Sequence, residues 1–308
     1  MIWLPKFACP ECRKALPVNG ANGADSAGGV VCSHCGTTFT RANGVYRFLS
    51  AERAEAAEPF QRQYRLVRER EGYRLASPDY YLRLPAVSSD DPHAAEWRIR
   101  RESFAHLQRH ALAERSRGSI KVLDLGAGSG WLSHRLAADG HCPVAVDRLD
   151  DEADGLGACR HYPVPFAAVQ ADFDALPFES SQFDLVVFDG SLHYASDPAA
   201  TLTEATRMLT PGGAIAVMDS PMFASDCDGQ AMVAEQLHRM EIEHGIPKAV
   251  QPGRGFLTFD MLEAAGRRLG LRARFFQSRG PLAWRLGRQV ARITLRRAPA
   301  AFGVWVAQ

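Results

Sequence analysis

Three glycines at alternate positions, Gly126, Gly128 and Gly130, follow Asp124 and separate a short apolar run from an amphipathic segment. We expect the apolar run to be a buried strand, and the glycines to form a turn whose backbone passes close to a ligand. Glycine suits this turn because a Cβ would hold the backbone away and because such turns visit positive φ. The spacing differs from the G-x-G-x-x-G of dinucleotide-binding folds, and an acid beside the glycines favours a cationic or hydroxyl-rich ligand.

Two Cys-x-x-Cys pairs near the start of the chain indicate a metal site. Cys9 with Cys12, and Cys32 with Cys35, are separated by 19 residues, which fits a zinc ribbon. Four thiolates around one Zn²⁺ would supply folding energy that so short a segment cannot obtain from a core of its own. The alternative is a set of unligated or redox-active thiols.

Acidic side chains also stand at the ends of later apolar runs. Asp147 comes about 20 residues after the glycines, Asp172 and Phe173 follow the third run, and Asp189 ends the fourth. Ligands of open α/β sheets bind outside the carboxyl ends of the strands, so we expect these residues to lie together. A carboxylate at the second strand end can accept hydrogen bonds from both hydroxyls of a ribose.

The elements that must position these residues alternate between strand and helix. Repeated β-α units predict a doubly wound, mostly parallel α/β sheet with helices on both faces. The predicted strands are Lys121–Leu125, Cys142–Val146, Ala167–Gln170, Asp184–Phe188, Ala214–Met218, Leu271–Phe276 and Gly303–Ala307. The predicted helices between them are Trp131–Asp139, Asp197–Met208, Asp228–His244 and Thr258–Leu269.

Composition divides the chain into three parts. Residues 1–50 form a zinc-ribbon-like domain with a loop at 19–29 and a hairpin that turns at Asn43-Gly44. Residues 51–117 form a helical linker or cap that includes the first helix of the following domain, and residues 118–308 form the α/β domain. The cluster 97–101 could line a substrate cleft, but its arginines favour a solvated basic face.

The ordered series of motifs resembles class I S-adenosylmethionine (SAM)-dependent methyltransferases of the type 11 kind. The series includes the glycine turn, the 172–178 segment in the form D-x-x-x-L-P-F, and Leu209-Thr-Pro-Gly-Gly213 before the fifth strand. The resemblance implies a seven-stranded sheet whose last strand, Gly303–Ala307, is antiparallel. It also implies SAM as the cofactor, bound by Asp124, Gly126, Ala127, Gly128, Gly130, Asp147, Asp172, Phe173 and Asp189.

Within this resemblance, Asp172 would accept a hydrogen bond from the adenine amino group, with Phe173 beside the ring. The acidic, glycine-punctuated loop after Asp147 departs from the family pattern. Asp154 in that loop could compete with Asp147 for the ribose, although a solvated loop is favoured. The cysteine pairs, Cys9 to Cys12 and Cys32 to Cys35, resemble those of the small zinc-binding activator subunit of tRNA and protein methyltransferases, so a partner protein could bind through the ribbon.

His193 follows the fourth strand and could act as a general base where the acceptor must lose a proton. The alternative is that this side chain packs against the cofactor or caps the next helix. Methyl transfer from a sulfonium mainly requires that donor and acceptor be aligned and that water be excluded.

Three classes of function remain open. The first is an enzyme with a small-molecule or natural-product acceptor, which we favour. The second is an RNA base methyltransferase that uses the ribbon and the arginine-rich tracts Arg62–Arg74 and Arg279–Arg297. The second tract could also lie on a membrane surface or be a solvated helix face. The third is a non-catalytic module that binds SAM and a partner.

Net charge and hydropathy exclude few further classes of function. The formal net charge of the 308-residue chain is +1, so no global field indicates nucleic acid or an anionic membrane. No apolar run approaches the roughly 20 residues that span a bilayer. The first residues lack the order of a signal peptide, so we expect a cytoplasmic protein.

Overall fold

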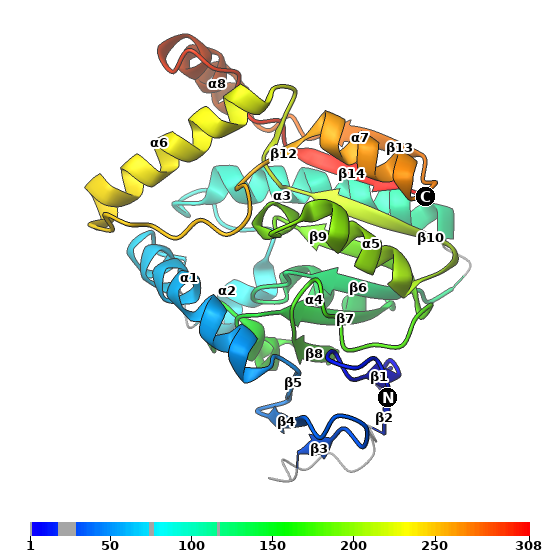
Figure 1. Ribbon diagram of the computed structural model, residues 1–308. Helices are drawn as coiled ribbons and strands as arrows, with labels where there is room; N and C mark the ends of the chain where they lie inside the picture. The colour runs from blue at the N-terminus through cyan, green and yellow to red at the C-terminus, as the bar shows by residue number, and fades with distance from the viewer. Residues whose placement is uncertain (1, 18–28, 74–76, 116–117) are drawn as a thin grey trace.

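The computed structural model describes residues 2–17, 29–73, 77–115 and 118–308. At its centre is a ten-stranded sheet with the order β13-β14-β10-β9-β6-β7-β8-β5-β4-β3 (Figure 1). Its strands are β3 (Val30–Val31), β4 (Thr38–Ala42), β5 (Val45–Arg47), β6 (Lys121–Leu125), β7 (Cys142–Asp147), β8 (Ala167–Gln170), β9 (Phe183–Asp189), β10 (Leu209–Met218), β13 (Ala273–Gln277) and β14 (Gly303–Ala307).

Seven of these strands form the doubly wound sheet that the sequence predicts. β8, β7, β6, β9 and β10 are parallel, and β14 runs antiparallel between β10 and β13. β6 shows why the sequence gives this sheet, since Val122, Leu123 and Leu125 are completely buried, as in a parallel strand covered on both faces. The seven-stranded prediction is therefore confirmed, and β5, β4 and β3 extend it.

Helices cover both faces of the sheet. One hydrophobic core includes side chains of α5 and α7, and a second core on the opposite face includes side chains of α2, α3 and α4. Figure 1 shows α5 and α7 in front of the sheet and α3 behind it. The helices are α1 (Ala51–Arg70), α2 (Pro78–Arg83), α3 (Ala94–Leu107), α4 (Trp131–Ala138), α5 (Pro198–Met208), α6 (Asp226–His244), α7 (Phe259–Arg268) and α8 (Leu282–Thr294).

The N-terminal strands are continuous with the large sheet. The hairpin predicted at Asn43-Gly44 joins β4 to β5, and β5 pairs in parallel with β8. Phe7 lies in an aromatic cluster with Phe48 and Phe178, its ring centroid 5.1 and 5.6 Å from theirs. Most of the predicted 19–29 loop lies outside the described residues. Two short pairings complete the strands, β1 (Phe7–Ala8) with β2 (Ala15–Leu16), and β11 (Met222–Phe223) with β12 (Leu257–Thr258).

Two segments depart from regular helix. In the first, α3 is followed by a π-helical turn, Gln108–Leu112, and a 3₁₀ turn, Ala113–Arg115. Between β7 and β8, the acidic loop is followed by a 3₁₀ helix, Leu156–His161. Among the residues that the structure describes, no helix combines the length and the apolar character that crossing a bilayer requires.

Candidate active site

In the glycine turn between β6 and α4, neighbouring side chains leave no room for a Cβ at two of the three glycines. Gly126 and Gly130 both have φ of +77°. A Cβ on Gly126 would lie 2.2 Å from the Cβ of Ser191, and one on Gly130 would lie 2.8 Å from the Sγ of Cys159. Gly128 differs, because the nearest atom to a Cβ there is 3.9 Å away. The backbone at Gly126 and Gly130 therefore requires glycine, while Gly128 leaves open space beside the turn.

Asp147, at the end of β7, is held by backbone hydrogen bonds. Its Oδ2 accepts from the amide of Gly128 at 2.8 Å, and its Oδ1 accepts from the amide of Leu149 at 2.8 Å. Burial nevertheless raises the pKa of Asp147. Each carboxylate oxygen keeps a second lone pair. The residue is thus a fixed acceptor for two hydroxyl groups.

Asp124 and Asp189 are buried carboxylates with incomplete hydrogen bonding. Asp124 Oδ2 accepts from the hydroxyl of Ser133 at 2.8 Å, while Oδ1 of Asp124 and Oδ1 of Asp189 have no partner among the described residues. Burial, followed by the charge of Asp189, raises the pKa of Asp124 to about 8. A cationic group between them would favour both carboxylates. These unpaired oxygens fit the amino group of an amino-acid ligand.

These strand ends meet at one cleft, which encloses about 1250 Å³ of empty space, open solvent at its mouth included. Most of the predicted cofactor residues line the cleft. They are Gly126, Ala127, Gly128, Asp147, Phe173 and Asp189. Four other predicted site residues are not part of its lining, namely Asp124, Gly130, Asp172 and His193.

Asp172 has partners within the protein. Its carboxylate pairs with Arg148 and, at 3.2 Å, with Arg53 of α1, and it accepts a hydrogen bond from the amide of Phe173 at 2.8 Å. Phe173 lines the cleft and meets Phe188 edge to face, with ring centroids 6.0 Å apart. In this arrangement, Asp172 fixes the ring at the cleft wall.

The side chains that the sequence analysis missed come from α1 and from the acidic loop. Arg68 makes a bidentate ion pair with Asp154, at 2.6 and 2.9 Å, and its guanidinium lies 3.6 Å from the centroid of the Tyr73 ring. Asp154 is only 7% exposed, so the expectation of a solvated acidic loop is wrong at this residue. Both members of the pair line the cleft, with Tyr64 and Tyr194 beside them.

Arg100 of α3 brings a guanidinium group into the cleft. Its guanidinium lies 3.9 Å from Asp189 and 5.1 Å from the ring of Trp97, and it has no hydrogen-bond partner among the described residues. Trp97 is 6% exposed, so the expected solvated basic face is wrong for these two residues and right for the exposed Arg98 and Arg101. The helical spacing of residues 97, 100, 104 and 107 was the sequence signal that places Arg100 on the same face of α3 as the apolar side chains. Free guanidinium donors here suit a carboxylate.

His193 is buried beside the cleft and does not line it. Its Nδ1 lies 3.1 Å from the hydroxyl of Ser220, and its ring packs against that of Tyr194 at a centroid distance of 4.1 Å. Burial, with the nearby charge of Arg100, lowers the pKa of His193 to about 3. This geometry argues against general-base catalysis, and the ring packs on Tyr194 within the protein.

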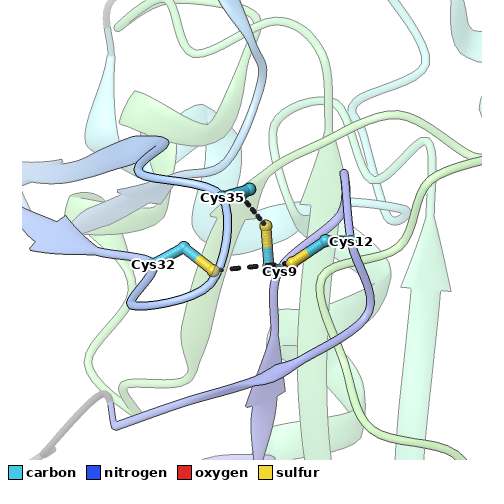
Figure 2. Close-up of side chains that lie close together, drawn as sticks. All are labelled: Cys9, Cys12, Cys32 and Cys35. Carbon is cyan, nitrogen blue, oxygen red and sulfur yellow. Dashed lines mark hydrogen bonds between the residues drawn. The ribbon is translucent and has the colours of Figure 1, made fainter.

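The two cysteine pairs converge at the N-terminal strands, as Figure 2 shows. The Sγ atoms of Cys9, Cys12, Cys32 and Cys35 all lie within 4.8 Å of one another. The Sγ distance is 3.6 Å between Cys9 and Cys35, and 3.5 Å between Cys12 and Cys32. A tetrahedral ion with Zn–S bonds of about 2.3 Å separates its ligands by about 3.8 Å. The donor set therefore fits a closed zinc site.

Comparison with known proteins supports an assignment to a family. Residues 123–217 match the family model described as "Methyltransferase domain". A malonyl-(acyl-carrier protein) O-methyltransferase of Erwinia billingiae is 31% identical over 187 residues, which are 60% of this chain and 66% of that protein. The chain carries a methyltransferase domain.

Other similarities are more local or more distant. The corresponding enzyme of Enterobacter lignolyticus is 37% identical over 101 residues, 33% of this chain and 39% of its own. The chain thus spans less than two thirds of the length of each of these relatives. Among solved structures, the magnesium protoporphyrin IX methyltransferase of Synechocystis, with bound SAM, is 12% identical at a TM-score of 0.46, covering 77% of this chain and 93% of that one.

Proposed function

We propose that this protein binds SAM in the cleft and transfers its methyl group to a small-molecule acceptor. The observation that carries the proposal is the convergence of four strand ends. Gly126, Asp147, Phe173 and Asp189 are spread over 63 residues of sequence and line one cleft. This is the place where open α/β sheets bind their ligands. The methyltransferase domain matched at residues 123–217 supports the same cofactor.

Each group of the cofactor has a complementary partner in the chain. Asp147 would accept from the ribose hydroxyls, and Phe173 would face the adenine. The free oxygen of Asp189 suits the amino group, with Asp124 buried close to Asp189, and Arg100 suits the carboxylate, because both contacts pair opposite charges.

The residues of the cleft then have a mainly geometric task. Bound SAM supplies a methyl group activated by its sulfonium, which needs no activation by the protein. Tyr64, Tyr73 and Tyr194 form an aromatic wall beside Arg68 and Arg100. Such a wall orients a small acceptor and excludes water from it.

The RNA alternative gains no support from the first arginine tract. Arg62 pairs with Glu58, Arg68 pairs with the buried Asp154, and Arg70 donates to the backbone of His244. Arg74 lies outside the described residues. These three side chains each have a partner within the protein.

The N-terminal residues 1–50 would bind one structural Zn²⁺ through Cys9, Cys12, Cys32 and Cys35. A four-cysteine site leaves no open position for catalysis, so the ion would stabilise the fold. We keep the division into residues 1–50, 51–117 and 118–308 as part of this proposal. A partner protein is not needed to explain the position of the ribbon, because its strand β5 already pairs with β8.

A labelling experiment tests the acceptor class. Purified protein is incubated with SAM carrying a radioactive methyl group and, separately, with fractionated metabolites, RNA and protein from the host. The proposal expects label in the metabolite fraction alone. Label in RNA or protein alone would replace the small-molecule acceptor, and label in no fraction despite SAM binding would support the non-catalytic alternative.

A further inference from the structure

Helix α8 presents large apolar side chains to solvent. Leu282, Leu286, Val290 and Ile293 are 71%, 66%, 62% and 80% exposed. Their spacing of four, four and three residues places them on one face of the helix. Figure 1 shows α8 at the periphery of the molecule, at the end opposite to β3 and β4. A continuous exposed apolar face of this kind marks an interaction site.

The opposite face of α8 is attached to the protein. The ring centroid of Trp284 lies 6.3 Å from that of Phe302, and Arg288 donates to the backbone oxygen of Ala300. Beyond the helix, Arg297 pairs with Glu235 of α6 at 2.6 Å. One side of α8 is therefore attached to the protein, and its apolar side faces solvent.

The charges within this segment of the chain have a single sign. Residues 279–297 contain six arginines and no acidic residue. Arg285 and Arg292 are exposed and follow the helix one turn and three turns from Leu282, along one flank of the apolar face. Aliphatic side chains flanked by arginines are the pattern of helices that lie in a membrane interface, where guanidinium groups meet lipid phosphates.

We infer that α8 docks this methyltransferase on an anionic lipid surface, with its apolar face among the acyl chains. The apolar face argues against RNA, because phosphate binding gains nothing from four aliphatic side chains at its centre. The charges argue against a second copy of α8, which would bring arginines with no acidic partners on the same helix. The inference does not depend on the acceptor or on the cofactor.

Vesicle flotation tests the inference with the full-length protein. The vesicles are phosphatidylcholine alone, or phosphatidylcholine with phosphatidylglycerol. We expect binding only to the anionic vesicles and a decrease of binding with added salt. Leu286→Glu with Ile293→Glu should abolish binding. Arg285→Gln with Arg292→Gln should weaken it about tenfold or more, since each arginine near an anionic surface contributes about 1 kcal/mol.

Ile242→Glu on α6 is the matched control. Ile242 is 69% exposed, so its replacement adds one glutamate, the same substitution as at each α8 position, at another exposed apolar site and should leave vesicle binding unchanged. SAM affinity, measured by calorimetry in every variant, should stay at the wild-type value because no α8 residue lines the cleft. That readout separates loss of docking from loss of folding.

Three results would overturn the inference. The first is no binding of the wild-type protein to anionic vesicles. The second is retention of RNA that depends on Arg285 and Arg292 but not on Leu286 and Ile293. The third is a dimer in solution that Leu286→Glu with Ile293→Glu dissociates while vesicle binding is unchanged.

Discussion

Asp124 is buried at the end of β6 with one carboxylate oxygen unpaired. Because burial raises its pKa to about 8, the folded protein holds a proton there that the unfolded chain releases above about pH 4. The protonated carboxyl of Asp124 therefore contributes to the stability of the ligand-free protein. This contribution is complete below about pH 4 and is lost as the pH rises through about 8. A cationic amino group beside Asp124 would lower the pKa again.

We therefore predict that SAM binding near pH 7 releases a proton from Asp124. Calorimetric titrations in two buffers with different ionisation heats should give different apparent enthalpies. Asp124→Asn should remove most of that difference, because the amide cannot titrate. Equal enthalpies for the wild-type protein in both buffers would contradict this account of Asp124.

The second prediction at the residue scale concerns His193. Its ring is held by Ser220 outside the cleft lining, with its pKa lowered to about 3. His193→Ala should therefore reduce the single-turnover rate at saturating SAM far less than the about 10²–10⁴-fold that loss of a general base costs. A loss of that size with unchanged SAM affinity would restore His193 as the base.

At the scale of elements, β5 covers the edge of β8. An unpaired edge strand exposes backbone donors and acceptors, and natural proteins cover such edges. The hairpin of β4 and β5 follows from Asn43-Gly44, so it was predictable from sequence. Its partner was not, because nothing in the residues 45–47 specifies β8 over another edge.

We predict that a bound zinc ion stabilises the N-terminal strands that cover the edge of β8. Purified protein should contain about one Zn²⁺ per chain, and Cys32→Ser should release it. A loss of about 3 kcal/mol of unfolding free energy would lower the melting temperature by roughly 5–10 °C. Cys227→Ser, at an exposed cysteine of α6, should change neither quantity. Wild-type protein without zinc, or Cys32→Ser with an unchanged melting temperature, would refute the ribbon.

At the scale of the whole molecule, the elements with a local sequence pattern were predictable. The apolar runs and the glycine turn located β6, β7, β8 and β9 to within a residue at each end, because each run is buried on both faces of the sheet. The strand ends then indicated which residues would face the ligand.

The contacts that α1 and α3 make with the strand ends could not be predicted from sequence. Arg68 and Asp154 are 86 residues apart, and neither stands in a motif. Arg100 belongs to a run of arginines that looks like a solvated face until α3 is placed on the sheet. The sequence therefore predicted strand-end residues of the cleft lining, and it did not predict the contribution of α1 and α3.

The central claim is that this cleft binds SAM through the strand-end residues, and a calorimetric titration of SAM tests it most directly. The wild-type protein should bind one SAM, and Asp147→Ala should weaken binding by about 1.5–3 kcal/mol, because both oxygens of Asp147 can accept from the ribose. Asp139→Ala, at the exposed end of α4, should match the wild type. Absence of SAM binding by the wild-type protein, or an affinity that Asp147→Ala leaves unchanged, would contradict the account.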